Sequence, residues 1–253
     1  KDLTPLANAH SATRHKLEEV VGLSDAPLTS YMAQVAPTRM LEITATAMMR
    51  AIETARQGSD YADLPLLAAV SPPRAGGAGG PFNYADIPAG PLKRRQIAEL
   101  HVFKDMIWAV PITGKELKDW LEKAAVAFAG EVDLLATGLL DLQVPAFEFD
   151  TIYGLSYEID PTRPAAFDRN GHPRNPQATR IGNLTYAGRS VSPSDRFLVA
   201  ASSYRACGGG QFPHLSPDRA MLRPVVSMET AIHACIAQAM PEVRPPPWRF
   251  SER

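Results

Sequence analysis

The sequence is poor in cysteine and contains no long apolar run. Cys207 and Cys235 are its two cysteines, a number that fits one disulfide or two buried thiols and is too small to identify a compartment. No window approaches about eighteen uninterrupted apolar residues, which predicts that no segment spans a membrane. The chain starts at Lys1 without an initiator methionine or an apolar signal core, and we expect this start to be a cut.

The chain also lacks a dominant sign of charge and any metal-binding spacing. Its net charge of −1 argues against polymeric nucleic acid as a partner, because such binding needs a basic face. A free mononucleotide needs only a few local cations. There is no Cys-x-x-Cys, His-Glu-x-x-His or Asp-x-His motif, and Gly154 to Glu158 fails the nucleophile elbow at its last position. We predict no catalytic residue, no metal ligand and no cofactor in this chain.

Proline, by contrast, is abundant, with 23 residues, so we expect a loop-rich fold with long ordered connections. Apolar periodicity predicts helices over residues 11–21, 38–58, 91–100, 115–128 and 225–240. Strands are predicted over residues 64–70, 102–103, 106–110, 147–160, 180–186 and 196–202, with the last two pairing as a hairpin-like meander. This pattern indicates an α+β fold, with mixed β-sheets flanked by helices.

The most informative stretch follows the predicted strand 196–202. That strand delivers Tyr204 to the mouth of a loop that contains Gly208, Gly209 and Gly210. Glycine lets the backbone turn with positive φ and lets another group approach closely, and tyrosine offers a stacking surface at low entropic cost. The pairing suits a flat ring. A glycine-rich connection whose tyrosine merely covers the core is an equally open interpretation.

A second glycine-rich loop, residues 72–81, follows the predicted strand 64–70. It lacks the Gly-Lys-Ser/Thr ending of a phosphate loop and the spaced glycines of a dinucleotide fingerprint, so we reject both motifs and keep Arg74 as a candidate anion contact. Phe103 is a second aromatic residue at a strand end, beside the hydrogen-bonding Asp105. If Phe103 and Tyr204 face each other about 7 Å apart, a base fits between them.

Several motifs, taken in order, resemble the C-terminal domain of the 5'-nucleotidase superfamily. Within it, the sequence is most similar to the bacterial periplasmic 2',3'-cyclic-nucleotide 2'-phosphodiesterase/3'-nucleotidase branch. The motifs are Pro-Pro-Arg-Ala-Gly-Gly-Ala-Gly-Gly-Pro at 72–81, Tyr-Ala-Asp-Ile-Pro-Ala-Gly at 84–90, the segment 110–122, Phe-Asp-Thr-Ile-Tyr-Gly at 149–154, Tyr-Glu-Ile-Asp at 157–160, Arg-Ile at 180–181 and Tyr-Arg-Ala-Cys-Gly-Gly-Gly at 204–210.

The resemblance implies a division of labour. In that family a separate N-terminal metallophosphoesterase domain, absent from this chain, holds two divalent metal ions and performs hydrolysis, while the C-terminal domain clamps the nucleobase between two aromatic rings. Residues 1–253 would form that single binding domain, with a linker and first helix in 1–27 and an irregular tail in 241–253. The expected partners are a nucleotide or nucleoside and the covalently linked N-terminal domain, and the expected location is the periplasm.

Residue by residue, Phe103 matches the first stacking position and Tyr204 the second. The remaining expected substrate contacts are Asp105, Arg74, Ser203, Gly208, Gly209 and Gly210. Three positions depart from the family pattern: Ala78 replaces a basic residue, Lys104-Asp105 replaces Pro-Asn or Gly-Asn, and Ser203 replaces asparagine. Asp105 accepts hydrogen bonds but cannot donate as asparagine does. We expect a hydrolase fragment that is inactive in isolation, and the alternative is a degenerate or stand-alone nucleoside-binding or interaction module.

Overall fold

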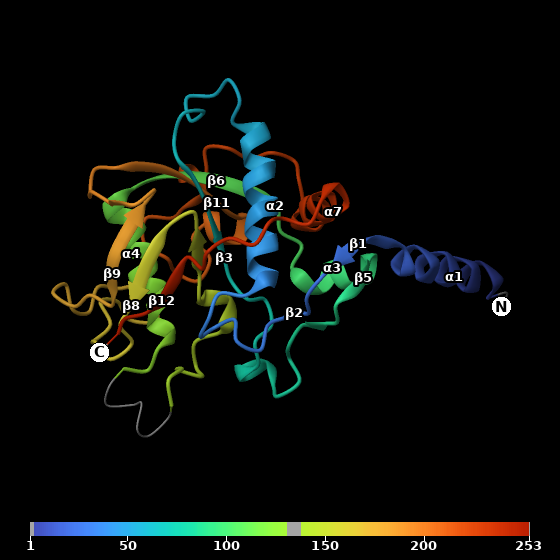
Figure 1. The fold of residues 1–253 in the computed structure, drawn as a ribbon, viewed down its shortest axis with the longest axis horizontal. Helices are drawn as coiled ribbons and strands as arrows, with labels where there is room; N and C mark the ends of the chain where they lie inside the picture. Colours follow the sequence, from blue (N-terminus) through green and yellow to red (C-terminus); the bar gives the residue numbers. More distant parts are fainter. Residues whose placement is uncertain (1–2, 131–137, 253) are drawn as a thin grey trace.

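A mixed four-stranded sheet forms the centre of the computed structural model, which describes residues 3–130 and 138–252 (Figure 1). Its strands are β3 (Leu66–Val70), β6 (Ile107–Thr113), β7 (Thr151–Tyr153) and β11 (Arg196–Ser202), in the order β6-β11-β3-β7. β11 runs parallel to β3 and antiparallel to β6, and β3 runs antiparallel to β7. The strands predicted over 64–70 and 196–202 are therefore confirmed.

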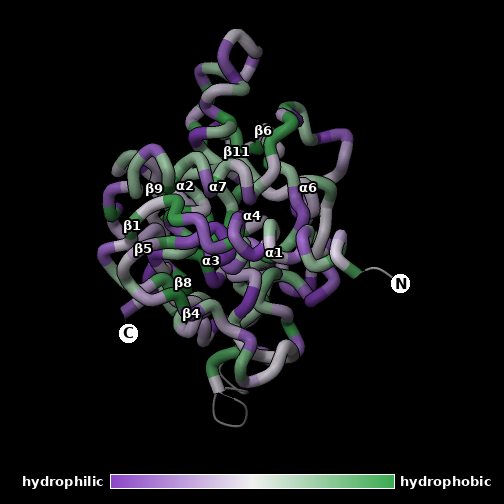
Figure 2. Tube along the Cα trace, turned by 90° about the vertical axis from the view of Figure 1, so that its right-hand side faces the viewer, coloured by the Kyte–Doolittle hydropathy of each residue, from purple (hydrophilic) through white to green (hydrophobic). Residues whose placement is uncertain are grey.

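The central sheet is buried on both faces. Along β11, Phe197 and Val199 belong to one hydrophobic cluster, whereas Leu198 and Ala200 belong to the other. Alternate residues of a strand point to opposite faces, so this continuous apolar run serves two cores, and the β6 and β11 segments are coloured hydrophobic in Figure 2. The helices α2 (Arg39–Ala55) and α7 (Met228–Gln238) cover one face, and α4 (Gly114–Ala124) contributes to the cluster on the other.

These three helices confirm the predictions over 38–58, 115–128 and 225–240, although each is shorter than predicted. The shorter elements are α3 (Arg94–Leu100), α6 (Ser203–Ala206) and the 3₁₀ turns Gly77–Gly79, Ala125–Ala127, Ala146–Glu148 and Pro217–Arg219. The predicted strand 102–103 was wrong, because these residues lie in a loop. The predicted strand 147–160 is confirmed in part, because β7 and β8 (Ser156–Ile159) lie within it and are separated at Gly154, whose φ of 99° only glycine adopts readily.

A second sheet lies beside α4, with the strand order β10-β9-β8-β12. Its strands are β8 (Ser156–Ile159), β9 (Ile181–Tyr186), β10 (Arg189–Ser190) and β12 (Trp248–Phe250). The predicted pairing of 180–186 with 196–202 was wrong, because β9 turns back at Ala187-Gly188, both with positive φ, onto β10. In β9, Gly182 and Asn183 are exposed, whereas β11 is buried along most of its length and belongs to the central sheet.

The predicted irregular tail over 241–253 was also wrong in part. β12 pairs in parallel with β8, and the buried Trp248 donates from Nε1 to the Thr151 hydroxyl at 3.2 Å. Its ring packs against Phe149, with centroids 5.6 Å apart. One large buried aromatic side chain thus holds a short strand in place directly after three prolines.

The N-terminal prediction was wrong at both ends. The helix α1 spans Thr4–Glu18 with Pro5 in its first turn, a position that proline tolerates well, and it projects from the body with no buried residue. Residues 20–21 extend into β1 (Val20–Ser24), which pairs with β5 (Gly90–Lys93). The predicted helix 91–100 therefore begins only at Arg94. A further pair joins β2 (Leu28–Thr29) to β4 (Asp86–Ile87).

Candidate functional site

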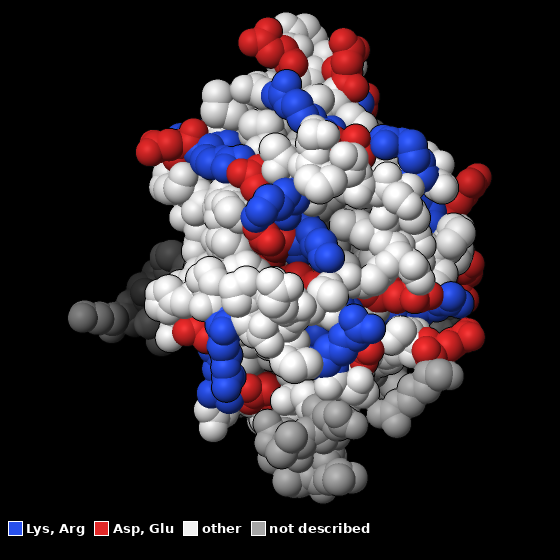
Figure 3. Space-filling model, turned by 90° about the vertical axis from the view of Figure 1, so that its left-hand side faces the viewer, with Lys and Arg blue, Asp and Glu red and all other residues white. Residues whose placement is uncertain are grey.

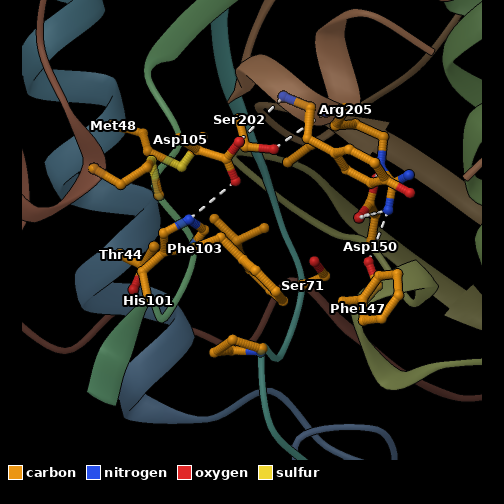
Figure 4. Close-up of a pocket in the computed structure, with 15 residues that line it drawn as sticks. Thr44, Met48, Ser71, His101, Phe103, Asp105, Phe147, Asp150, Ser202 and Arg205 are labelled. Carbon is orange, nitrogen blue, oxygen red and sulfur yellow. Dashed lines mark hydrogen bonds and ion pairs between the residues drawn. The ribbon is translucent and has the colours of Figure 1, made fainter. Parts of the chain in front are cut away.

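A cavity of about 240 Å³ lies at one edge of the central sheet (Figure 4). At this edge β3 and β11 end and β6 and β7 begin, because Val70 pairs with Thr151 and Ser202 pairs with Ile107. The strand ends thus bring four loops together. The lining residues are Thr44, Met48, Ala69, Val70, Ser71, Pro73, His101, Phe103, Asp105, Phe147, Asp150, Ser202, Tyr204, Arg205 and Met228.

Phe103 and Tyr204, the two aromatic residues predicted from the sequence, both line this cavity. The pairing of β6 with β11 brings them together from positions far apart in the chain. The two residues remain 44% and 48% exposed, although both line the cavity. Two half-exposed rings on the wall of one mostly apolar cavity are suited to a flat ligand.

The glycine loop forms the support of the Tyr204 ring. A Cβ atom added at Gly209 would lie 2.5 to 2.6 Å from three carbons of that ring, so the ring rests directly on the backbone. Gly208 and Gly210 have φ values of 91° and 74°, which turn the loop beneath it. One face of the ring is therefore occupied by Gly209, and the half-exposed remainder is accessible from the cavity.

Asp105 fixes the turn that carries Tyr204. Its Oδ1 accepts from the Ser203 hydroxyl at 3.3 Å and from the Tyr204 N–H at 3.4 Å, and its Oδ2 lies 3.2 Å from His101 Nε2. Burial by itself would raise the pKa of Asp105, but the hydrogen bond and charge of His101, with the bonds from Tyr204 and Ser203, lower it below its ordinary value.

An ionised carboxylate has roughly four acceptor positions, and the three bonds to Asp105 leave one on Oδ2. Asp105 can therefore still accept from a ligand amino group in the cavity. Ser203, by contrast, does not line the cavity, and its hydroxyl also accepts from the Met106 N–H at 3.1 Å. Ser203 thus positions the turn, and its role as a substrate contact stays a prediction.

Arg74 lies outside the cavity, although its neighbour Pro73 lines it. Its Nε donates to Asn83 Oδ1 at 3.2 Å, and its Nη1 is 3.9 Å from a Glu99 carboxylate oxygen. The side chain is 29% exposed. Arg74 is thus engaged by Asn83, just after its loop, and by Glu99 of α3, and its role as an anion contact stays a prediction. The side chain of Ala78, in the same loop, is outside what the structure describes.

Sequence reasoning missed a buried ion pair behind the cavity. Arg205 and Asp150 have side chains only 5% and 3% exposed, and they form two bonds, at 2.7 and 3.1 Å. Arg205 also donates to the carbonyl of Phe147 at 2.8 Å and to that of Gly209, while Trp120 Nε1 donates to Asp150 at 2.7 Å. The pair joins the start of β7 to the segment that contains Phe147 and to the glycine loop beneath Tyr204.

A third aromatic residue in the cavity, Phe147, was missed as well. Its ring stands at 77° to Phe103 and at 79° to Tyr204, with centroids 5.9 and 6.5 Å away. No signal in the sequence indicated it, because a spacing of two residues from Phe149 within one predicted strand would place both rings on the same face, whereas residues 146–148 form a 3₁₀ turn. Phe149 enters the core, whereas Phe147 faces the cavity.

The sequence also raised expectations about the cysteines, metal ligands, membrane-spanning segments and surface charge. Both cysteines are free, Cys235 buried and Cys207 half-buried, so they form no disulfide. Across residues 3–130 and 138–252 no group of three or more His, Cys, Asp or Glu side chains is arranged to hold a metal ion, and no helix there is long and apolar enough to cross a membrane. Figure 3 shows acidic and basic side chains interspersed over one face of the molecule.

Comparison with known proteins places this architecture. Residues 20–217 match the model of the family described as 5'-nucleotidase, C-terminal domain. The chain is 36% identical over 217 residues to the trifunctional nucleotide phosphoesterase protein YfkN of Bacillus subtilis, covering 85% of this chain and 15% of that protein. It is 35% identical over 206 residues to the 2',3'-cyclic-nucleotide 2'-phosphodiesterase/3'-nucleotidase of Salmonella typhimurium, covering 79% of this chain and 32% of that protein.

Among solved structures, the 5'-nucleotidase precursor from Thermus thermophilus superimposes with a TM-score of 0.69 at 15% identity, covering 98% of this chain and 43% of that one. An identity this low shows the fold alone, and it confirms the predicted α+β architecture. The chain spans less than a third of the length of the two relatives named above. Because the family model matches most of its residues, this chain belongs to the 5'-nucleotidase C-terminal domain family.

Proposed function

We propose that this chain is the nucleobase-binding domain of a nucleotide phosphohydrolase similar to 2',3'-cyclic-nucleotide 2'-phosphodiesterase/3'-nucleotidase. The observation that carries the proposal is the placement of two half-exposed rings, Phe103 and Tyr204, on the wall of one cavity. The names of the relatives, which describe phosphodiester and phosphomonoester hydrolysis of nucleotides, support this substrate class.

The energetics limit what the cavity does alone. Stacking contributes about 1–3 kcal/mol per contact between a base and an aromatic ring, so two rings supply about 2–6 kcal/mol. A micromolar complex needs about 8 kcal/mol. A bare base therefore binds weakly, and the edge contact to Asp105 and contacts to the ribose and phosphate supply the rest.

Hydrolysis belongs, in this proposal, to a covalently linked N-terminal metallophosphoesterase domain in the periplasm. Two divalent ions held there would activate a water and neutralise phosphate charge. The described residues of this chain offer no ligand set for such ions, so its contribution is to hold the base and orient the ester. On its own the chain binds nucleosides and hydrolyses nothing.

Titration calorimetry with adenosine and 3'-AMP tests the proposal. The variants Phe103→Ala and Tyr204→Ala each remove one stacking surface and weaken binding at least about fivefold. Phe82→Ala is the matched control, because Phe82 is 92% exposed and does not line the cavity. If the wild-type chain shows no binding at millimolar ligand, the proposal fails.

A second candidate function is a nucleoside-binding or interaction module without hydrolase activity. The engagement of Arg74 by Asn83 and Glu99, outside the cavity, favours this alternative. The reading frame upstream of Lys1 separates the two functions. Asp-x-His and Asn-His metal motifs there support the hydrolase, and an upstream sequence without them supports the binding module.

A further inference from the structure

We infer that Phe147 is a third substrate-contacting wall of the cavity, and that it makes the cavity prefer purines to pyrimidines. The inference rests on the proposed function, because it assigns the ring-size preference of the same site. The observation behind it is the perpendicular placement of Phe147 against both predicted stacking residues.

The angles determine how a ligand meets this wall. A base stacked on Tyr204 lies parallel to that ring and therefore stands at about 79° to Phe147, and a base stacked on Phe103 stands at about 77° to it. Aromatic rings favour such edge-to-face contacts. Phe147 thus forms a favourable contact with any ring system long enough to reach it, without competing for the stacking faces.

The length of the cavity separates the two classes of base. In Figure 4 Asp105 and Phe147 lie on opposite sides of Phe103. A base whose amino group donates to the remaining acceptor position of Asp105 has to extend past Phe103 before it touches Phe147. The two fused rings of a purine extend farther than the single ring of a pyrimidine, so the purine gains the edge-to-face contact and the pyrimidine leaves a gap.

The wall is held rigidly, which selection by size requires. The Phe147 carbonyl accepts from Arg205 Nη2 at 2.8 Å, and the same guanidinium donates to Gly209, the residue beneath the Tyr204 ring. Arg205 is itself fixed by Asp150 in a buried pair. One buried cation therefore ties the backbone of Phe147 to the backbone beneath Tyr204, so the backbone that carries the Phe147 ring cannot shift relative to the Tyr204 loop without breaking a hydrogen bond to Arg205.

The test compares adenosine with cytidine, because both carry an amino group for Asp105. Dissociation constants are measured by calorimetry for the wild-type chain, Phe147→Leu and Phe147→Tyr. Wild type binds adenosine more tightly than cytidine. Phe147→Leu removes the ring but keeps an apolar side chain, so adenosine binding weakens about three- to tenfold while cytidine binding changes less than about twofold. Phe147→Tyr keeps the ring and retains the preference.

The outcomes separate this inference from the proposed function. If the wild-type chain binds neither nucleoside, the proposed function fails. If wild type binds both and Phe147→Leu leaves their affinity ratio unchanged, or weakens both equally, Phe147 is no size-selecting wall and only the inference fails. Thermal unfolding of each variant accompanies the titrations. If Phe147→Leu loses part of its fold, the test rests on Phe147→Tyr, which has to retain the preference for adenosine over cytidine.

Discussion

Two glycine-rich loops leave the same edge of the central sheet, one after β3 and one after β11, and they serve different purposes. In the first, a Cβ at Gly76 would collide with the Tyr84 hydroxyl, and one at Gly79 would collide with Asn83. Those glycines make room for side chains of their own loop. In the second, Gly209 seats a ring that faces the cavity, and a buried arginine holds the loop to the sheet.

The number of glycines in a loop therefore does not indicate the function of that loop. The side chain that packs against each glycine does indicate it. Both loops contain an arginine that the sequence alone does not distinguish. Arg205 is almost fully buried and paired with Asp150, and Arg74 is partly exposed and bound to Asn83. The glycines of the first loop therefore accommodate neighbouring side chains, although Pro73 at its start lines the cavity, whereas a glycine of the second loop supports the Tyr204 ring.

The largest expected effect comes from the two arginines. Arg205→Met leaves the Asp150 carboxylate buried and unpaired, which destabilises the fold by about 3–5 kcal/mol and abolishes nucleoside binding. Arg74→Met, the matched control in the first loop, changes stability by no more than about 0.5 kcal/mol. Urea unfolding of both variants measures the difference. Equal, small losses would contradict the claim that the second loop is held by a buried ion pair.

The glycines give a smaller effect that separates binding from stability. Gly209→Ala places a methyl group against the Tyr204 ring and displaces it, so adenosine binding weakens at least about fivefold. Gly77 has a φ of 60° with open space around its Cβ position, so Gly77→Ala costs about 1 kcal/mol of stability and leaves adenosine affinity unchanged. Calorimetry and thermal unfolding of both variants make the comparison, and a loss of binding in Gly77→Ala would refute it.

The sequence predicted the centre of the fold better than its edges. β3 and β11 are continuous apolar runs because both faces of their sheet are buried, and this pattern needs no partner to be recognised. β12 has three residues and depends on β8, about ninety positions earlier in the chain. A strand so short is stabilised by its partner and by the burial of Trp248, and neither is visible in the local sequence.

Some residues of the site could be predicted from the sequence, and others could not. Phe103 and Tyr204 were found because they match family positions and follow predicted strands, and the structure brings both to one cavity, Phe103 from the loop before β6 and Tyr204 from the turn after β11. Arg205 adjoins Tyr204 in the sequence, yet a buried arginine and a solvated one have the same local signature. Its partner Asp150 lies 55 residues away, so only the assembled sheet edge reveals the pair and the Phe147 carbonyl that it holds.

The smallest expected effect is a pH-dependent change in stability, and it is tested with two carboxylates. Asp105 bonds the turn that carries Tyr204 before the second loop, and Asp86 follows the first loop and bonds Tyr31. Asp105→Asn weakens the bonds to His101, Ser203 and the Tyr204 N–H, at a cost of about 1 kcal/mol at neutral pH. Because the folded pKa of Asp105 lies below its ordinary 3.8, its stabilisation is complete above that pH and is lost as the pH falls through the folded pKa.

The unfolding free energies of wild type and Asp105→Asn should therefore differ by a constant amount near neutral pH and converge below about pH 3.8, the ordinary value for this carboxyl. Asp86 is exposed and accepts from the Tyr31 hydroxyl at 2.9 Å, so Asp86→Asn serves as the control for removing a carboxylate away from the Tyr204 turn. Denaturant unfolding of wild type, Asp105→Asn and Asp86→Asn, measured at several pH values between about pH 2 and pH 7, gives the unfolding free energies for this comparison. If the Asp105 difference persists undiminished in acid, its carboxylate charge does not hold the Tyr204 turn, and the contrast between the two loops reduces to the buried arginine alone.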